Sequence, residues 1–119
     1  MSQLFASFQN SIPTHNKARF HSAGRALLAK LAQELHLTTD QRNIRSCKGG
    51  PAIMGEVILH TDEIYVQIHS HGVMFRTCNG RRDYSGGHNN FASHAVLNDP
   101  HAFALCLRGH IVAKLARAC

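Results

Sequence analysis

Three apolar runs in the middle of the chain have the β-branched, alternating character of strands and are joined by connections too short for a crossover. They cover residues 53–60, 64–69 and 73–78, and three residues separate each run from the next. Connections of this length join antiparallel neighbours, whereas parallel strands need a dozen residues or more. A shorter run at 43–47, ended by Lys48-Gly49-Gly50-Pro51, predicts another strand. The sequence therefore predicts a four-stranded antiparallel meander.

Alternation within these runs assigns side chains to the two faces of the predicted sheet, because successive residues of a strand point in opposite directions. One face receives an apolar set, namely Ile64, Val66, Ile68, Val73 and Phe75. The other face receives a mixed polar and aromatic set, namely Tyr65, Gln67, His69, Met74 and Arg76. We expect the apolar face to be covered by helices.

Helical periodicity appears on either side of the predicted sheet. From about residue 17 to residue 37, apolar residues recur at steps of three and four, at Phe20, Leu27, Leu28, Leu31 and Leu35. Gly24 weakens the first half of this helix, and Thr38-Thr39-Asp40 ends it.

The second helix begins at Asn98-Asp99-Pro100, where Asp99 is expected to cap it and Pro100 to occupy its first turn. A stripe of Phe103, Leu107, Ile111 and Leu115 continues to the end of the chain, and Cys106 on this helix is expected to be buried. The sequence thus predicts an α+β fold, with a four-stranded antiparallel sheet and the N-terminal and C-terminal helices packed on one face. Residues 1–119 are predicted to form a single domain, with 1–15 as an irregular arm.

An excess of basic residues favours anionic partners such as nucleic acid or an acidic protein face. Thirteen lysines and arginines against seven acidic residues give a net charge of +6 at pH 7, and ten histidines add charge in mild acid. The alternative is that this charge only keeps a small protein soluble, since no run of five like charges occurs. No apolar run reaches the roughly 18 residues of a membrane span. The N-terminal MSQLFASFQNSIPTHN lacks the pattern of a secretory signal, so we expect a reducing cytoplasm.

The segment from Arg76 to Phe91, RTCNGRRDYSGGHNNF, has the composition of a binding surface and is called the arginine segment below. Guanidinium groups suit phosphates or carboxylates, a tyrosine can stack, and histidine and asparagine supply hydrogen-bonding edges. The alternative is an ordinary solvated loop, pinned to the core by Tyr84 and Phe91. The candidate contact residues are Arg76, Arg81, Arg82, Tyr84, His88, Asn89 and Asn90, together with Tyr65, Gln67 and His69 on the sheet.

A metal site and a catalytic cysteine are two alternatives to a contact surface. His60, His69 and His71 could bind zinc if the strands brought them together, although a histidine-rich surface can equally be compositional. Cys78 could be a nucleophile with His88 as its base, but a lone pair of this kind is a weak signal. The sequence contains no cofactor motif; Ser85-Gly86-Gly87 lacks the spacing of a phosphate-binding loop. We therefore expect a protein that is not an enzyme and has no metal or cofactor.

Residues 47–68, CKGGPAIMGEVILHTDEIYVQI, and residues 76–92, RTCNGRRDYSGGHNNFA, resemble segments of small uncharacterised proteins encoded by phages and prophages. The resemblance implies a small protein of the host-cell cytoplasm. Such phage proteins include inhibitors of bacterial defence complexes of the CRISPR type. The expected function is therefore a phage-derived inhibitor that contacts a host protein or nucleoprotein; the alternative is a nucleic-acid-binding protein that uses the same arginines.

Overall fold

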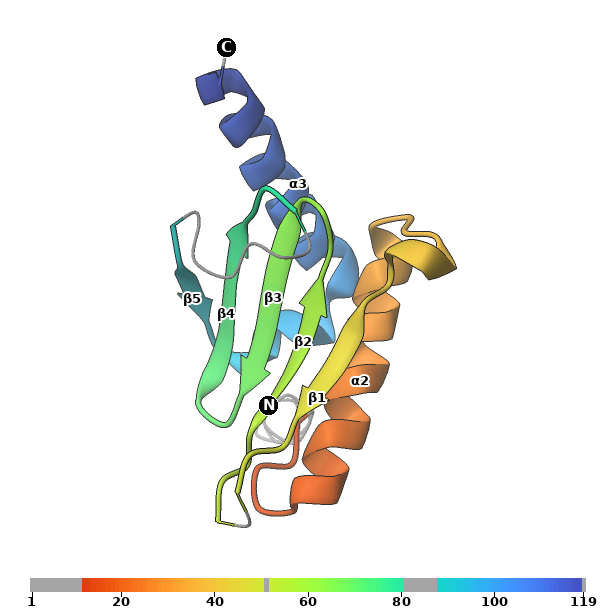
Figure 1. Ribbon diagram of the computed structural model, residues 1–119, viewed down its shortest axis with the longest axis vertical. Helices are drawn as coiled ribbons and strands as arrows, with labels where there is room; N and C mark the ends of the chain where they lie inside the picture. The colour runs from red at the N-terminus through yellow and green to blue at the C-terminus, as the bar shows by residue number, and fades with distance from the viewer. Residues whose placement is uncertain (1–11, 51, 81–87, 119) are drawn as a thin grey trace, which may run out of the picture.

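The computed structural model describes residues 12–50, 52–80 and 88–118 and has the predicted α+β architecture (Figure 1). Two helices, α2 (Lys17–Glu34) and α3 (Pro100–Ala118), lie against one face of an antiparallel sheet. The strands, in their order across the sheet, are β1 (Ile44–Cys47), β2 (Glu56–His60), β3 (Ile64–His69), β4 (Gly72–Thr77) and β5 (Asn90–Ala92). Two short 3₁₀ helices, η1 (Thr39–Gln41) and η2 (His94–Asn98), precede β1 and α3. None of the helices in these residues is long and apolar enough to cross a membrane.

The fifth strand corrects the predicted count of four. β5 is only three residues long. It lies where the predicted loop ends and the chain leads on toward the last helix. It exists because Ala92, Phe91 and Asn90 pair with Val73, Met74 and Phe75 of β4. A strand this short carries no readable alternation, so pairing with β4 defines it.

Hydrogen bonds define both ends of helix α2, and the sequence pattern predicts only some of them. The side chain of Asn16 accepts a hydrogen bond from the Arg19 amide at 3.1 Å, which caps the first turn. At the other end His36 has a φ of 57°, and the amide of Leu37 donates to the carbonyl of Ala32 at 3.0 Å. This left-handed residue ends the helix at Glu34, before the predicted end at residue 37.

The buried face of α2 approaches the sheet closely at Gly24. Phe20, Leu28 and Leu31 are fully buried, as their spacing predicts. A Cβ atom built on Gly24 would lie 2.9 Å from Cγ2 of Val57 in β2. Gly24 therefore does more than weaken the helix, because its missing side chain lets α2 pack directly on β2.

The predicted alternation in the sheet is confirmed by the strand register. Val57, Val66 and Val73 are all fully buried in the core beneath the helices. The first part of the run at 53–60 is an exception: Ile53 is exposed and β2 begins only at Glu56. Gly55 has a φ of 82° and lies so close to the carbonyl of Cys47 that a Cβ has no room, so the chain turns there before the strand begins.

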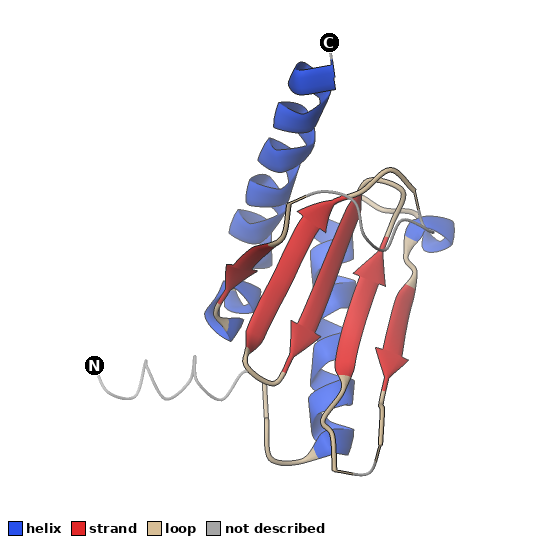
Figure 2. Cartoon of the chain, turned by 60° about the vertical axis from the view of Figure 1, so that its left-hand side comes forward, coloured by secondary structure: helices blue, strands red, loops and turns tan. Residues whose placement is uncertain are grey.

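Helix α3 has the predicted start, but its C-terminal turns extend beyond the sheet (Figures 1 and 2). The carboxylate of Asp99 accepts from the Ala102 amide at 3.1 Å, as expected of the cap. Phe103 and Leu107 are buried, whereas Leu115 is 58% exposed because no strand lies beneath it. Cys106 is also exposed, which corrects the expectation that it is buried.

The described part of the predicted arm is attached to the body. Residues 12–15 precede α2, and Ile12 is only 2% exposed within the same core as Phe20 and Leu28. Residues 1–11 lie outside the described residues. The anchoring of Ile12 shows that the ordered core begins before the first long helix.

Replacing Gly24 with alanine is expected to lower the free energy of unfolding by about 1–3 kcal/mol, because the added methyl group overpacks against Val57. This loss exceeds the gain of up to about 1 kcal/mol in helix propensity. Urea unfolding followed by circular dichroism measures the difference. The matched control is Ser22→Ala at an exposed position of the same helix, which should not destabilise the fold. A Gly24→Ala variant as stable as wild type would show that the space between α2 and β2 can accommodate the added methyl group.

Candidate functional site

The helices leave one face of the sheet uncovered (Figure 2). The strand register places the candidate contact residues of the strands on this face. Cross-strand pairing places Tyr65 between His60 and Arg76, and Gln67 between Ile58 and Met74. This uncovered side is called the open face below. The structure thus brings Tyr65, Gln67, His69 and Arg76 onto one face, as the alternation predicts.

A stack of rings and a guanidinium lies on the open face near the turn between β2 and β3. The rings of His60 and Tyr65 meet edge to face with centroids 4.9 Å apart, and the Arg76 guanidinium lies 4.6 Å from the Tyr65 centroid. The Nε2–H of His60 donates to the carbonyl of Gly80 at 3.1 Å. These interactions join β2, β3 and β4 across the face.

Burial of this stack differs from the expectation of an exposed polar surface. Tyr65 is 8% exposed, Arg76 is 3% exposed and His60 is fully buried. Burial raises the pKa of the Tyr65 hydroxyl, and the positive charges of Arg45 and Arg76 partly oppose this increase. Contact of Tyr65 and Arg76 with a partner stays a prediction, while their observed role is to hold the strands together.

The remaining strand candidates lie nearer the surface. Gln67 is half-buried, and its side-chain amide donates to the carboxylate of Glu56 at 3.0 Å. His69, also half-buried, accepts a hydrogen bond at Nδ1 from the backbone amide of His71 at 3.2 Å. Both side chains are accessible enough to contribute to a contact without rearrangement of the sheet.

The described part of the arginine segment divides into exposed and structural residues. His88 and Asn89 are exposed, whereas the side-chain amide of Asn90 donates to the carbonyls of Phe75 and His88. Asn90 therefore fixes the path of the chain into β5. The predicted contact residues Arg81, Arg82 and Tyr84 lie outside the described residues.

Phe91 is an exposed aromatic residue, whereas the alternative interpretation of the arginine segment, an ordinary solvated loop, pins it to the core. It is 73% exposed and pairs with Met74 on the open face, next to the exposed Asn89. The direction of its side chain depends on the pairing of β5 with β4. Sequence alternation offers no signal for it, since the strand contains only Phe91 and one residue on each side.

The structure does not assemble the three predicted histidines into a metal site. His60 pairs with Tyr65, four residues along β3 from His69, a separation of roughly 13 Å at the usual strand rise. His69 and His71 are neighbours, with ring centroids 6.3 Å apart. Within residues 12–50, 52–80 and 88–118, no three histidine, cysteine or acidic side chains are grouped so that they could hold a metal ion.

Cys78 is not presented as a surface nucleophile. Its side chain is 2% exposed, and the thiol donates to the carbonyl of Thr61 at 3.3 Å. Reactive cysteines need access and an environment that stabilises the thiolate. A thiol that donates to a buried carbonyl contributes to packing at the end of β4.

Many basic side chains of the described residues bind backbone carbonyls at the ends of helices and strands. Long cationic side chains in such positions satisfy acceptors that secondary structure leaves unpaired. The donor and acceptor pairs are Lys17 with Gly50, Arg25 with Ile44, Arg42 with Leu37, Arg108 with Glu34, and Lys114 with Cys78. These five basic side chains of the described residues thus come from several elements, and each of them donates to the backbone.

No protein-family model, curated protein or solved structure matches this chain.

His69 is expected to titrate below its ordinary pKa of 6.5. Burial is the main cause of the lowered pKa, followed by the charges of His94 and His71, while Glu56 acts in the opposite direction. The unfolded chain takes up this proton near pH 6.5 and the folded chain resists it. The contribution of His69 to stability is therefore fully present above pH 6.5 and is lost as the pH falls below that value.

Nuclear magnetic resonance of the His69 ring across pH 4–8 measures this pKa directly. A His94→Gln variant should raise the pKa, because it removes a nearby charge and keeps a hydrogen-bond donor. His101→Gln, at an exposed position on α3, is the matched control and should leave it unchanged. A wild-type titration midpoint at or above 6.5 would contradict the burial argument.

Proposed function

We propose that this chain is a non-enzymatic binding protein that acts by protein contact through its open face and the arginine segment. The observation that carries the proposal is the exposure of Phe91, 73% accessible beside Met74 on the face that no helix covers. Aromatic anchors surrounded by polar groups are typical of the centres of protein interfaces. The exposed His88 and Asn89 supply polar groups next to this anchor.

The buried stack of His60, Tyr65 and Arg76 supports this function by making the face rigid. A preformed surface loses less side-chain entropy on binding than a flexible one. Ring and guanidinium contacts join β2, β3 and β4 on the same face, two residues along the strands from the pair of Gln67 and Met74. The face can therefore present Phe91 and Gln67 in a defined geometry.

The proposed partner is a host defence nucleoprotein of the CRISPR type, which a phage-derived protein would inhibit by occupying one of its surfaces. The resemblance of residues 47–68 and 76–92 to phage and prophage proteins supports this choice. In such a complex Arg81 and Arg82 would meet acidic side chains, or take the place of nucleic acid on the partner. The net charge of +6 suits either role.

Pull-down from a bacterial host lysate tests the surface. Phe91→Ala should weaken capture of the partner about tenfold or more, as expected for loss of an aromatic hot spot. The charge-reversal variant Arg81→Glu/Arg82→Glu should weaken it as well. Ile53→Ala, another exposed apolar residue but in the β1–β2 connection, is the matched control and should keep wild-type capture. Recovery of the same partners by all the variants would remove the open face from consideration.

Direct nucleic-acid binding is the second candidate, favoured by the net charge of +6 and the arginines of the arginine segment. Lys17 and Arg25 of α2 and Arg42 after η1 donate to backbone carbonyls, which favours protein contact instead. Phosphate binding releases counterions, so the affinity would fall steeply with salt. We expect no shift of single- or double-stranded DNA or RNA in a gel titration at low salt. A shift that disappears at high salt would favour this second candidate.

A further inference from the structure

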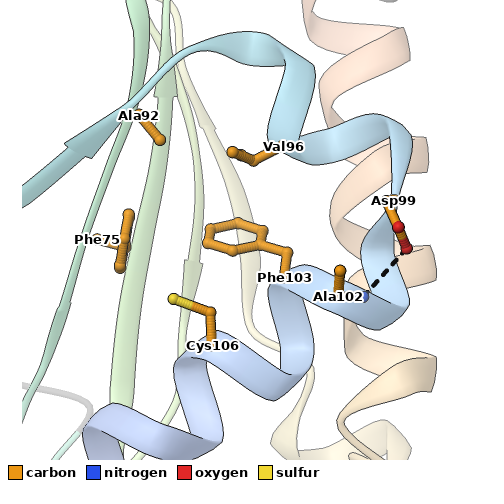
Figure 3. A pocket seen from close by; sticks show the side chains of 7 residues that line it. All are labelled: Phe75, Ala92, Val96, Asp99, Ala102, Phe103 and Cys106. Atoms are coloured by element: carbon orange, nitrogen blue, oxygen red, sulfur yellow. Dashed lines mark hydrogen bonds between the residues drawn. The ribbon is translucent and has the colours of Figure 1, made fainter.

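An apolar cleft lies on the helix side of the sheet, where the first turns of α3 meet η2 and the strands β4 and β5 (Figure 3). It has a volume of about 290 Å³. Its base is formed by the rings of Phe75 and Phe103, which meet edge to face with centroids 5.2 Å apart. Both residues belong to the buried core, so the base of the cleft is a fixed part of the fold.

The walls of the cleft are side chains no larger than valine, which leave room above the two rings. Three elements contribute them, namely Ala92 of β5, Val96 of η2, and Ala102 and Cys106 of α3. A step of four places residues 102 and 106 on the same face of the helix. The thiol of Cys106 points toward Phe75 (Figure 3). Ala102 and Cys106 are exposed, so the cleft is open to solvent along α3.

Asp99 is the one charged side chain among the residues that line the cleft. Its Oδ1 accepts from the Ala102 amide at 3.1 Å, which caps α3 (Figure 3). A carboxylate has a second oxygen, so a hydrogen-bond donor of a ligand can bind Asp99 without breaking the cap. The negative charge of Asp99 disfavours an anionic ligand at the same place.

The size and the lining of the cleft match a small aromatic molecule. An apolar cavity of roughly 150 Å³, lined by leucine, isoleucine and phenylalanine, stays dry and binds benzene in another protein. The present volume of about 290 Å³ is roughly twice as large, enough for two fused rings. Seven residues line the cleft, whereas a stable protein interface takes roughly 20–30 residues on each side. A small molecule therefore fits the cleft better than the surface of a second protein does.

We propose that this cleft binds a small aromatic molecule of one or two rings that carries a hydrogen-bond donor and no negative charge. The rings of the ligand pack on Phe75 and Phe103, where edge-to-face and offset contacts with a further ring are favourable. The donor binds the carboxylate of Asp99. Burial of apolar surface supplies most of the affinity, as in other small-molecule sites with few polar groups.

The cleft and the open face lie on opposite sides of β5. Ala92, which lines the cleft, pairs with the buried Val73, whereas the exposed Phe91 pairs with Met74 of the open face. Neighbouring residues of a strand point to opposite faces of the sheet. Binding in the cleft is therefore independent of the protein contact proposed for the open face, and each can fail without the other.

Titration of the full chain with indole, followed by nuclear magnetic resonance of the backbone amides, tests the proposal. Saturable shifts are expected at residues 92, 96 and 106, with a dissociation constant on the order of 1 mM or lower. Ala102→Phe places a ring in the cleft and should raise this constant about tenfold or more. Ala113→Phe, at an exposed alanine of α3 outside the cleft, is the matched control and should bind like wild type.

The same titration with indoleacetate tests the charge of the ligand. This probe keeps the rings and the N–H of indole and adds a carboxylate, so it should bind wild type several-fold more weakly at pH 7. Circular dichroism checks that both variants fold. Shifts that do not saturate with indole, equal binding by Ala102→Phe and wild type, or tighter binding of indoleacetate than of indole would overturn the proposal.

Disulfide exchange at Cys106 tests the cleft without filling it by mutation. In a Cys47→Ser/Cys119→Ser background, Cys106 should form a mixed disulfide with phenylethanethiol roughly tenfold more favourably than with mercaptoethanol, because only the phenyl ring gains from entering the cleft. Cys78 is buried and should not react. The control is Cys106→Ser/Val112→Cys in the same background, which places the thiol on an exposed turn of α3 and should show no such preference. An equal preference at the two positions would overturn the proposal.

Discussion

The pairing of β3 with β2 and β4 is the constraint on which the rest of this structure depends. It places Val57, Val66 and Val73 together under the helices, and it aligns His60, Tyr65 and Arg76 on the opposite face. Because side chains alternate with a period of two, a shift of one residue would exchange the two sets. The same register therefore determines both the core and the candidate contact face.

The two helices are attached to this sheet by different means. Helix α2 approaches β2 through the missing side chain of Gly24, so the attachment depends on close packing. Helix α3 packs with Phe103 and Leu107 and is also held by Arg108 and Lys114, whose side chains reach backbone carbonyls. This inward use of charge leaves the outer side of α3 apolar.

The candidate contact face and helix α3 lie on opposite sides of the sheet (Figures 1 and 2). On the open face, interactions among buried groups provide rigidity, while Phe91, His88 and Asn89 provide exposed groups for recognition.

Local patterns in the sequence predicted the fold class, the face of the sheet to which each β3 side chain points, and the Asp99 cap. Each of these depends on residues that are near neighbours in the chain. They did not predict β5, the burial of Tyr65 and Arg76, or the exposure of Phe91, Cys106 and Leu115. These features depend on what lies across the sheet or beyond its edge. The sequence by itself determined the two long helices and the four strands β1 to β4, because their patterns are local. Only the tertiary structure decided which polar and apolar groups reach the surface, because burial is set by contacts between distant segments.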